Sequence, residues 1–130
     1  MYNKGGCFCG AARFKVEGEP LRMGQCHCDA CRKPSGTGHF VQAFFMRDQV
    51  KIDGLTQTYD WVADSGSARK WHFCPTCGSR LFSENSKRPD NIGIAAGAFD
   101  NSDWFKPEFR VYSHNKPVWD VVDDQIEVRS

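Results

Sequence analysis

The sequence has no long hydrophobic run, no low-complexity tract and no excess of charge of one sign. No apolar stretch approaches the roughly 18 residues of a membrane-spanning helix, so we expect no membrane partner. The 17 Lys and Arg residues against 16 Asp and Glu give a formal net charge of +1. This balance argues against a nucleic-acid-binding protein whose affinity comes from phosphate contacts. Residues 1–6 show no apolar stretch after their charge, so no signal peptide is predicted and a cytoplasmic location is expected.

Helical patterning is also scarce. The only expected helical turn spans residues 29–33 and is ended by Pro34 and Gly36. Its N-terminal amides would favour a bound anion or thiolate beside Cys28. Short stretches of strand character, separated by turn signals about ten residues apart, predict a mainly β fold. The expected strands cover residues 12–17, 21–25, 39–45, 50–52, 57–62, 69–73, 80–83 and 91–98, with weaker candidates at 111–112 and 126–128. The length predicts a single domain over residues 1–130.

Cysteine is abundant, and its seven residues fall into three clusters. An odd number cannot pair completely in disulfides within the chain. Closely spaced cysteines in a cytosolic chain indicate metal binding rather than disulfides. The clusters are Cys7 and Cys9; Cys26, Cys28 and Cys31; and Cys74 and Cys77.

The number of thiols in each cluster suggests two different metal sites. Structural zinc sites take four protein ligands, whereas catalytic sites keep three and leave one position for water or substrate. If the first and third clusters share one ion, that site is closed and the middle cluster forms an open one. A thiol–disulfide couple at Cys74 and Cys77 is the alternative, but that interpretation expects a βαβ context, which the flanking residues do not supply. Gly78 after Cys77 is typical of a tight turn that requires a positive φ.

Four segments together resemble the glutathione-dependent formaldehyde-activating enzyme family. They are GCFCGAARF at residues 6–14, CHCDACRK at 26–33, FCPTCGSRLF at 73–82 and AGAFD at 96–100. The resemblance implies a small zinc-stapled fold like that of the Mss4 proteins (a β-tent), mainly β with little helix. Beyond Phe99 the chain departs from the family pattern, since it carries Pro117-Val118-Trp119 where the family has Pro-Trp, and its tail is short.

The resemblance also implies which cysteines hold which ion. The structural zinc would be bound by Cys7, Cys9, Cys74 and Cys77. The catalytic zinc would be bound by Cys26, Cys28 and Cys31, in agreement with the count of thiols. The family reaction is of the carbon–sulfur lyase type: glutathione adds through its thiol to formaldehyde and gives S-hydroxymethylglutathione. A small thiol and a small aldehyde are therefore the expected partners. Two zinc ions are the expected cofactors, and the catalytic one is expected to be the more labile.

Glutathione carries two carboxylates, so its pocket should offer cations. Arg32 and Lys33 are the first choice because they follow Cys31 directly, and the other candidates are Arg13, Arg69 and Lys70. Each of these residues is by default a solvated surface group. Asp29 is either a helix N-cap or a proton acceptor near the open site.

Two other classes of function stay open at this point. One is a non-catalytic binding module in which a fourth protein ligand, His27 or His39, closes the second zinc site. His27 is otherwise expected to be a partly buried or supporting residue that points away from its neighbouring cysteines. The other is storage of zinc or thiols, or redox sensing. His39 and His72 are expected to pack within strands, and His114 to lie at the surface.

Overall fold

The computed structural model describes residues 2–129, and its strands far outnumber its helical segments. The expectation of a mainly β fold with little helix is confirmed. The strands are β1 (Tyr2–Gly6), β2 (Arg13–Glu17), β3 (Arg22–Cys26), β4 (Phe40–Met46), β5 (Val50–Asp53), β6 (Gln57–Val62), β7 (Ala68–Phe73), β8 (Arg80–Asn85), β9 (Asn91–Ala95), β10 (Phe109–Val111) and β11 (Glu127–Arg129). The helical segments are α1 (Asp29–Ser35) and the short 3₁₀ turns η1 (Arg47–Gln49), η2 (Ala96–Ala98) and η3 (Ser113–Asn115).

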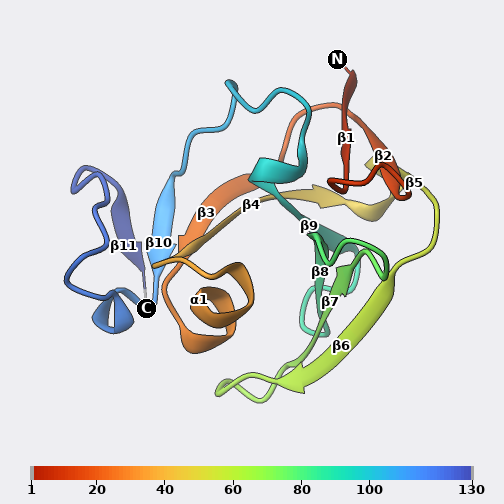
Figure 1. The fold of residues 1–130 in the computed structure, drawn as a ribbon. Coiled ribbons are helices and arrows are strands. Elements are labelled where there is room, and N and C mark those ends of the chain that lie inside the picture. The colour runs from red at the N-terminus through yellow and green to blue at the C-terminus, as the bar shows by residue number, and fades with distance from the viewer. Residues whose placement is uncertain (1, 130) are drawn as a thin grey trace.

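The strands form two sheets (Figure 1). The smaller sheet has the order β1-β2-β5, and the larger has the order β11-β10-β3-β4-β9-β8-β7-β6. Most neighbours are antiparallel, as expected of strands joined by short turns, but β10 runs parallel to both β3 and β11. A backbone bridge between Gly5 and Phe99 joins the small sheet to the segment after β9.

The two sheets share one hydrophobic core. Strand β2 shows the alternation that builds it: Phe14 and Val16 are buried, whereas Lys15 between them is exposed. The Phe14 ring meets Phe82 edge-on at 5.6 Å and Phe99 at 5.0 Å between centroids. Burial of each such side chain contributes about 1.5–3 kcal/mol.

Strand β1 was not expected, because its polar, glycine-rich sequence lacks an alternating pattern. It forms because it pairs with β2 along its whole length. Gly5 permits this close packing, since a Cβ there would lie 2.1 Å from the carbonyl oxygen of Ala98. The expected strand over 91–98 is too long, because its last three residues form η2 instead.

Helix α1 continues further than the sequence predicts. Pro34 lies in its last turn, and the chain leaves the helix through Gly36 at φ 73°. Cys28, not Asp29, is the N-cap residue, so the N-cap alternative for Asp29 is wrong by one position.

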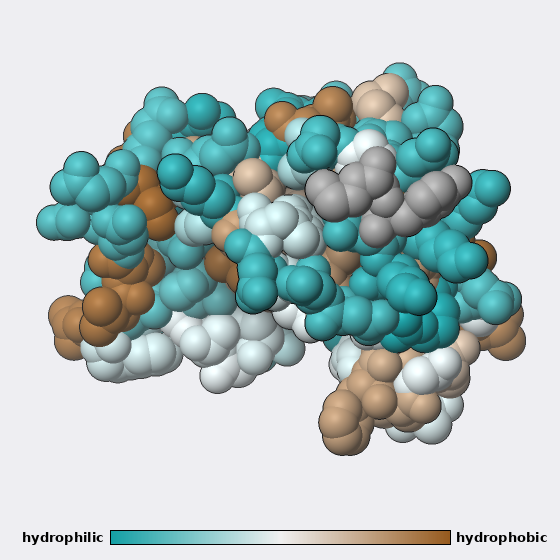
Figure 2. All heavy atoms as spheres, turned by 90° about the horizontal axis from the view of Figure 1, so that it is seen from above, coloured by the Kyte–Doolittle hydropathy of each residue, from teal (hydrophilic) through white to brown (hydrophobic). Residues whose placement is uncertain are grey.

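Figure 2 shows hydrophilic residues over most of one face of the molecule, with hydrophobic residues in separate groups between them. Within residues 2–129, none of the helices has the length and apolar character that crossing a membrane requires.

Candidate metal centres and the adjoining cleft

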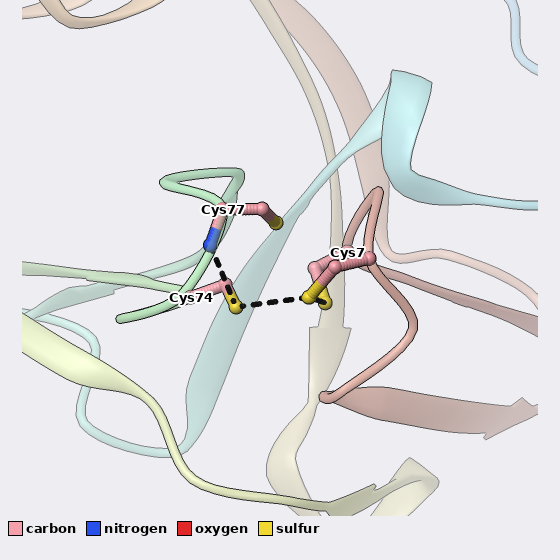
Figure 3. A group of neighbouring side chains, drawn as sticks. Cys7, Cys74 and Cys77 are labelled. Atoms are coloured by element: carbon pink, nitrogen blue, oxygen red, sulfur yellow. Dashed lines mark hydrogen bonds between the residues drawn. The ribbon is translucent and has the colours of Figure 1, made fainter.

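Four cysteines from two distant turns come together. Cys7 and Cys9 lie in the turn between β1 and β2, and Cys74 and Cys77 lie in the turn between β7 and β8. Their sulfur atoms all lie within 4.8 Å of one another. The Sγ atom of Cys9 is 3.6 Å from that of Cys7 and 3.7 Å from that of Cys74. Figure 3 shows how the labelled cysteines Cys7, Cys74 and Cys77 approach from opposite sides.

This four-cysteine group fits a tetrahedral metal ion. A Zn–S bond of about 2.3 Å gives sulfur–sulfur distances of about 3.8 Å in a tetrahedron, close to the spacing of the Cys9 sulfur from its neighbours. Backbone amides turn toward the sulfurs: Ala12 N–H donates to Cys7 Sγ at 3.2 Å, and Cys77 N–H to Cys74 Sγ at 3.5 Å. The amide of Ala12 lowers the pKa of Cys7. Gly78 has the positive φ, 78°, that the sequence predicts for this turn.

Cys26, Cys28 and Cys31 form a second group. Cys26 ends β3, Cys28 caps α1 and Cys31 lies in its first turn. Their ligand atoms lie within 4.8 Å of one another, with 3.3 Å between Cys26 Sγ and Cys28 Sγ. Among residues 2–129, no His, Cys, Asp or Glu side chain joins these three thiols as a fourth member. The group therefore has the donor set and the ligand number of an open metal site.

The three thiols share their protons unequally. The thiols of Cys26 and Cys31 donate to the Cys28 sulfur and lower the pKa of Cys28 to about 2, and backbone amides at the start of α1 add to this effect. The resulting anion beside them raises the pKa of Cys26 to about 12 and raises that of Cys31. Without metal, the negative charge of this group thus resides on Cys28, where the sequence predicts a thiolate.

A cleft of about 530 Å³ opens onto the three-cysteine group. Residues of β3, β4, β6, β7, β8 and β10 line it, together with the start of α1 and the turn at η3. Many of these lining side chains are aromatic: Phe40, Phe44, Trp61, Trp71, Phe109 and Tyr112. Volume and lining are those of a site for a small organic molecule.

Arg80 lies in this cleft and was not among the candidates from the sequence. Its guanidinium carbon is 4.0 Å from the centre of the Phe40 ring and 4.7 Å from that of Trp71. Its Nη1 donates to the carbonyl oxygen of Ala30 in a long bond of 3.4 Å. The sequence signal was too weak to find it, since Arg80 stands 49 positions after Cys31 and only the pairing of β8 with its neighbours brings it there.

Of the cations that the sequence predicts for the substrate pocket, only some line the cleft. Arg69 and Lys70 line the cleft. Arg32 forms an ion pair with Asp29, which lies at the start of α1 and lines the cleft. Lys33 is exposed and does not line the cleft. Arg13 forms an ion pair with Asp100 at 2.6 Å, beside the small sheet.

His27 and His39 meet at Asp120. His27 is completely buried, and its Nδ1 lies 3.3 Å from both the carbonyl oxygen of Gly38 and the Asp120 carboxylate. His39 Nδ1 is 2.8 Å from the same carboxylate oxygen. These three side chains form a separate group that can also hold a metal ion, and neither histidine joins the three-cysteine group. Asp120 could not be found from the sequence, because nothing around it relates it to residues some 80 to 90 positions earlier.

The other two histidines lie elsewhere. His72 accepts or donates through both ring nitrogens, at 2.9 Å from Thr56 Oγ1 and 2.5 Å from Glu84 Oε2, within the large sheet. His114 is exposed, as expected, but stands at the edge of the cleft.

Comparison with known proteins agrees with this geometry. Residues 2–115 match the family model described as glutathione-dependent formaldehyde-activating enzyme. A protein of Halomonas elongata, which carries glutathione-dependent formaldehyde-activating enzyme as a provisional name, is 31% identical over 136 residues, covering 99% of this chain and 86% of its own length. The crystal structure of a Rhodobacter sphaeroides protein superimposes with a TM-score of 0.61 at 22% identity, over 75% of this chain and 88% of the other. The last likeness concerns the fold alone.

Proposed function

This chain belongs to the glutathione-dependent formaldehyde-activating enzyme family, and from that premise we propose that it catalyses the addition of a glutathione-like thiol to formaldehyde or another small aldehyde. The product is an S-hydroxymethyl adduct, which makes the enzyme a carbon–sulfur lyase in the reverse direction. The observation that carries the proposal is the three-cysteine group that opens into a cleft of about 530 Å³.

We propose two zinc ions with different roles. Cys7, Cys9, Cys74 and Cys77 hold a structural ion that ties the β1–β2 turn to the β7–β8 turn. Cys26, Cys28 and Cys31, which line the cleft, would hold a second ion. When bound, this zinc stabilises a thiolate or polarises an aldehyde oxygen.

The residues around the second site bind and orient the substrates. The thiolate sulfur attacks the carbonyl carbon, the new C–S bond forms, and the electron pair of the C=O π bond moves to oxygen, which then takes a proton. Arg69 and Lys70 line the cleft and are suited to the carboxylates of the thiol substrate. Arg32 and Lys33 remain candidates for the same task, although Arg32 must leave Asp29 to perform it.

The binding-module alternative has less support. It needs His27 or His39 to complete the three-cysteine group, and the Nδ1 atoms of both histidines face Asp120. A protein that stores zinc or thiols, or that senses redox state, would not need a cleft beside its cysteines, so the cleft favours the enzyme. A cytoplasmic location, where small thiols are reduced, remains a prediction that suits the proposed reaction.

Exchange NMR with ¹³C-formaldehyde and glutathione tests the proposal, because it measures the rate of adduct formation at equilibrium above the uncatalysed rate. The wild type should accelerate exchange. Cys28→Ser should abolish the acceleration and lower the zinc content by one ion per chain. Lys51→Gln, on the exposed face of the small sheet, serves as the control and should behave as the wild type. An unchanged rate and zinc content in Cys28→Ser would refute the open site.

A further inference from the structure

Arg80 is a half-buried cation that lacks a carboxylate partner. Among residues 2–129, Arg13, Arg32 and Arg47 each form an ion pair with an acidic side chain, whereas no carboxylate lies within ion-pair distance of Arg80. Its Nε is buried and has no hydrogen-bond partner. The long bond from Nη1 to Ala30 O is the one hydrogen bond that the structure gives the Arg80 side chain. Burial of such a group without an acceptor is costly, so its free N–H groups favour a hydrogen-bond acceptor bound in the cleft.

The charge opposite Arg80 comes from the three-cysteine group. Burial lowers the pKa of Arg80, and the negative charge of Cys31, Cys28 and Cys26 opposes this effect. The contact of Nη1 with the carbonyl oxygen of Ala30, which lies between Cys28 and Cys31 in the chain, places the guanidinium beside the three-cysteine group. The guanidinium stays protonated at physiological pH. Arg80 and the three cysteines line the same cleft, so a substrate that binds beside the thiols also lies near Arg80.

Two aromatic rings hold the guanidinium in place. Phe40 on β4 and Trp71 on β7 approach it at 4.0 Å and 4.7 Å, distances at which cation–π attraction is effective. Both rings belong to the large sheet, which fixes their positions. A donor that is oriented before the reaction needs no reorganisation when charge develops in front of it, and this is the condition for efficient electrostatic catalysis.

We propose that Arg80 is a catalytic residue that binds the oxygen anion formed when the thiolate adds to the aldehyde. The C–S bond forms, the π electrons of the carbonyl group become the negative charge on oxygen, and the free N–H groups of Arg80 donate to that oxygen until it takes a proton from water. The adduct contains all the atoms of the thiol and the aldehyde, so the reaction needs no other reactant. This inference rests on the proposed function and names a residue that stabilises the transition state of the proposed addition.

Two other roles for Arg80 make different predictions. If Arg80 binds a carboxylate of the thiol, its loss will raise the KM for the thiol and leave kcat nearly unchanged. If Arg80 only compensates the charge of the metal ligands, its loss will reduce the zinc content. The proposed role predicts a fall in kcat of about 10²–10³-fold with little change in KM and with the zinc content intact.

The kinetic test compares Arg80→Met with Arg22→Met. Arg22 is a matched control because its guanidinium also lies over an aromatic ring, 4.4 Å from the centre of Phe44, but it does not line the cleft. Arg22→Met should keep the wild-type kcat. If Arg80→Met fails to fold, as judged by its circular dichroism, Arg80→Lys replaces it and should still lose most of kcat, because a lysine cannot reproduce the planar donor pair.

A binding test gives a result that does not depend on turnover. S-carboxymethylglutathione and S-carbamoylmethylglutathione carry a carboxylate and a neutral amide, respectively, at the same position close to the sulfur. Isothermal titration calorimetry measures the binding of each. The wild type and Arg22→Met should prefer the charged ligand by about tenfold or more, as a hydrogen bond to a charged group implies. Arg80→Met should lose this preference.

The outcomes separate the two proposals. A charge preference that survives in Arg80→Met, an equal loss of affinity for both ligands, or an unchanged kcat would each overturn the role of Arg80 while leaving the proposed function intact. Absence of acceleration by the zinc-loaded wild type would overturn the proposed function and the inference with it.

Discussion

Cys28 differs from its two neighbours in the charge that its sulfur carries. Its pKa is lowered to about 2 by donation from Cys26 and Cys31, whereas the pKa of Cys26 is raised to about 12. In protein that retains one zinc per chain after mild chelation, iodoacetamide should therefore alkylate Cys28 well before Cys26 and Cys31, because only thiolates react. Peptide mass mapping over a time course measures this order. Equal rates for the three would contradict the assignment of the charge to Cys28.

The Glu84 carboxylate makes the stability of the folded protein depend on pH in the acid range. Burial raises its pKa, but hydrogen bonds from His72 and Arg47 lower it by more, so the net pKa lies below the ordinary 4.5. The unfolded chain thus binds a proton at this position at higher pH than the folded protein does. The stabilisation is present above pH 4.5 and is lost as the pH falls through the folded pKa.

Denaturant unfolding at several pH values should show this dependence. Below pH 4.5, the free energy of unfolding should fall more steeply in the wild type than in Glu84→Gln. Glu19→Gln, at an exposed position, should follow the wild type. Since acid also releases zinc from all three proteins, the comparison between them isolates the contribution of Glu84. Parallel curves for the wild type and Glu84→Gln would argue against it.

The clustered cysteines could be identified as candidate ligands from the sequence, whereas Arg80 in the cleft and Asp120 beside the two histidines could not. Spacing within a cluster, such as that of Cys26 and Cys28, is local and can be read directly. Arg80 and Asp120 act through contacts across 50 to 90 positions, and no local pattern encodes such contacts. The strand pairings that create them depend on the register of the whole large sheet.

At the scale of the elements, the connection between α1 and β4 packs against the tail of the chain. Gly38 lies in this connection, and a Cβ there would be 2.3 Å from the carboxyl carbon of Asp120. Gly38→Ala should therefore displace Asp120 from His27 and His39 and destabilise the protein by about 1–3 kcal/mol. Gly97→Ala is the control, since no atom lies within 4 Å of the added Cβ there.

Chemical denaturation of the two alanine variants measures the difference. Gly97→Ala should lie within about 0.5 kcal/mol of the wild type, as is usual for a substitution without contacts. Equal stabilities for Gly38→Ala and the wild type would mean that the Asp120 segment does not pack against this connection.

Local sequence patterns predicted most elements, and tertiary pairing determined the others. Strands β2, β4 and β6 begin and end close to the expected positions. Strand β2 alternates apolar and polar residues, and β4 is a nearly continuous apolar run. Strand β1 has no such pattern and exists because β2 offers it a partner. Helix α1 extends to Ser35 although Pro34 has no N–H to donate to the carbonyl oxygen of Ala30. That oxygen accepts from Arg80 instead, and Gly36, at positive φ, closes the last turn by donating its N–H to Arg32 O.

At the scale of the whole molecule, the two metal centres have different consequences for folding. The four-cysteine group joins turns that lie 65 or more positions apart, so an ion there connects the first and second halves of the chain. The three-cysteine group spans only six positions, residues 26–31. Loss of the first ion should unfold the protein, because binding of a structural zinc is coupled to folding, whereas loss of the second should remove activity alone.

The resemblance read from the sequence led to the correct family, and the comparisons confirm it. The fold class followed from the pattern of short strands. That residues 1–130 act as one domain stays a prediction, as does the identity of the thiol and the aldehyde. Under the proposed function, substrate choice would follow from the shape of a cleft to which six strands contribute, and such a shape is a property of the folded sheet rather than of any segment.

The most direct test of the account is isotope exchange of zinc in the intact protein, followed by native mass spectrometry. Protein purified without chelator is incubated with isotopically enriched zinc in the presence of glutathione. We expect two zinc ions per chain, of which one exchanges rapidly and the other stays bound. Two ions that both resist exchange would contradict an open, thiol-accessible site at Cys26, Cys28 and Cys31.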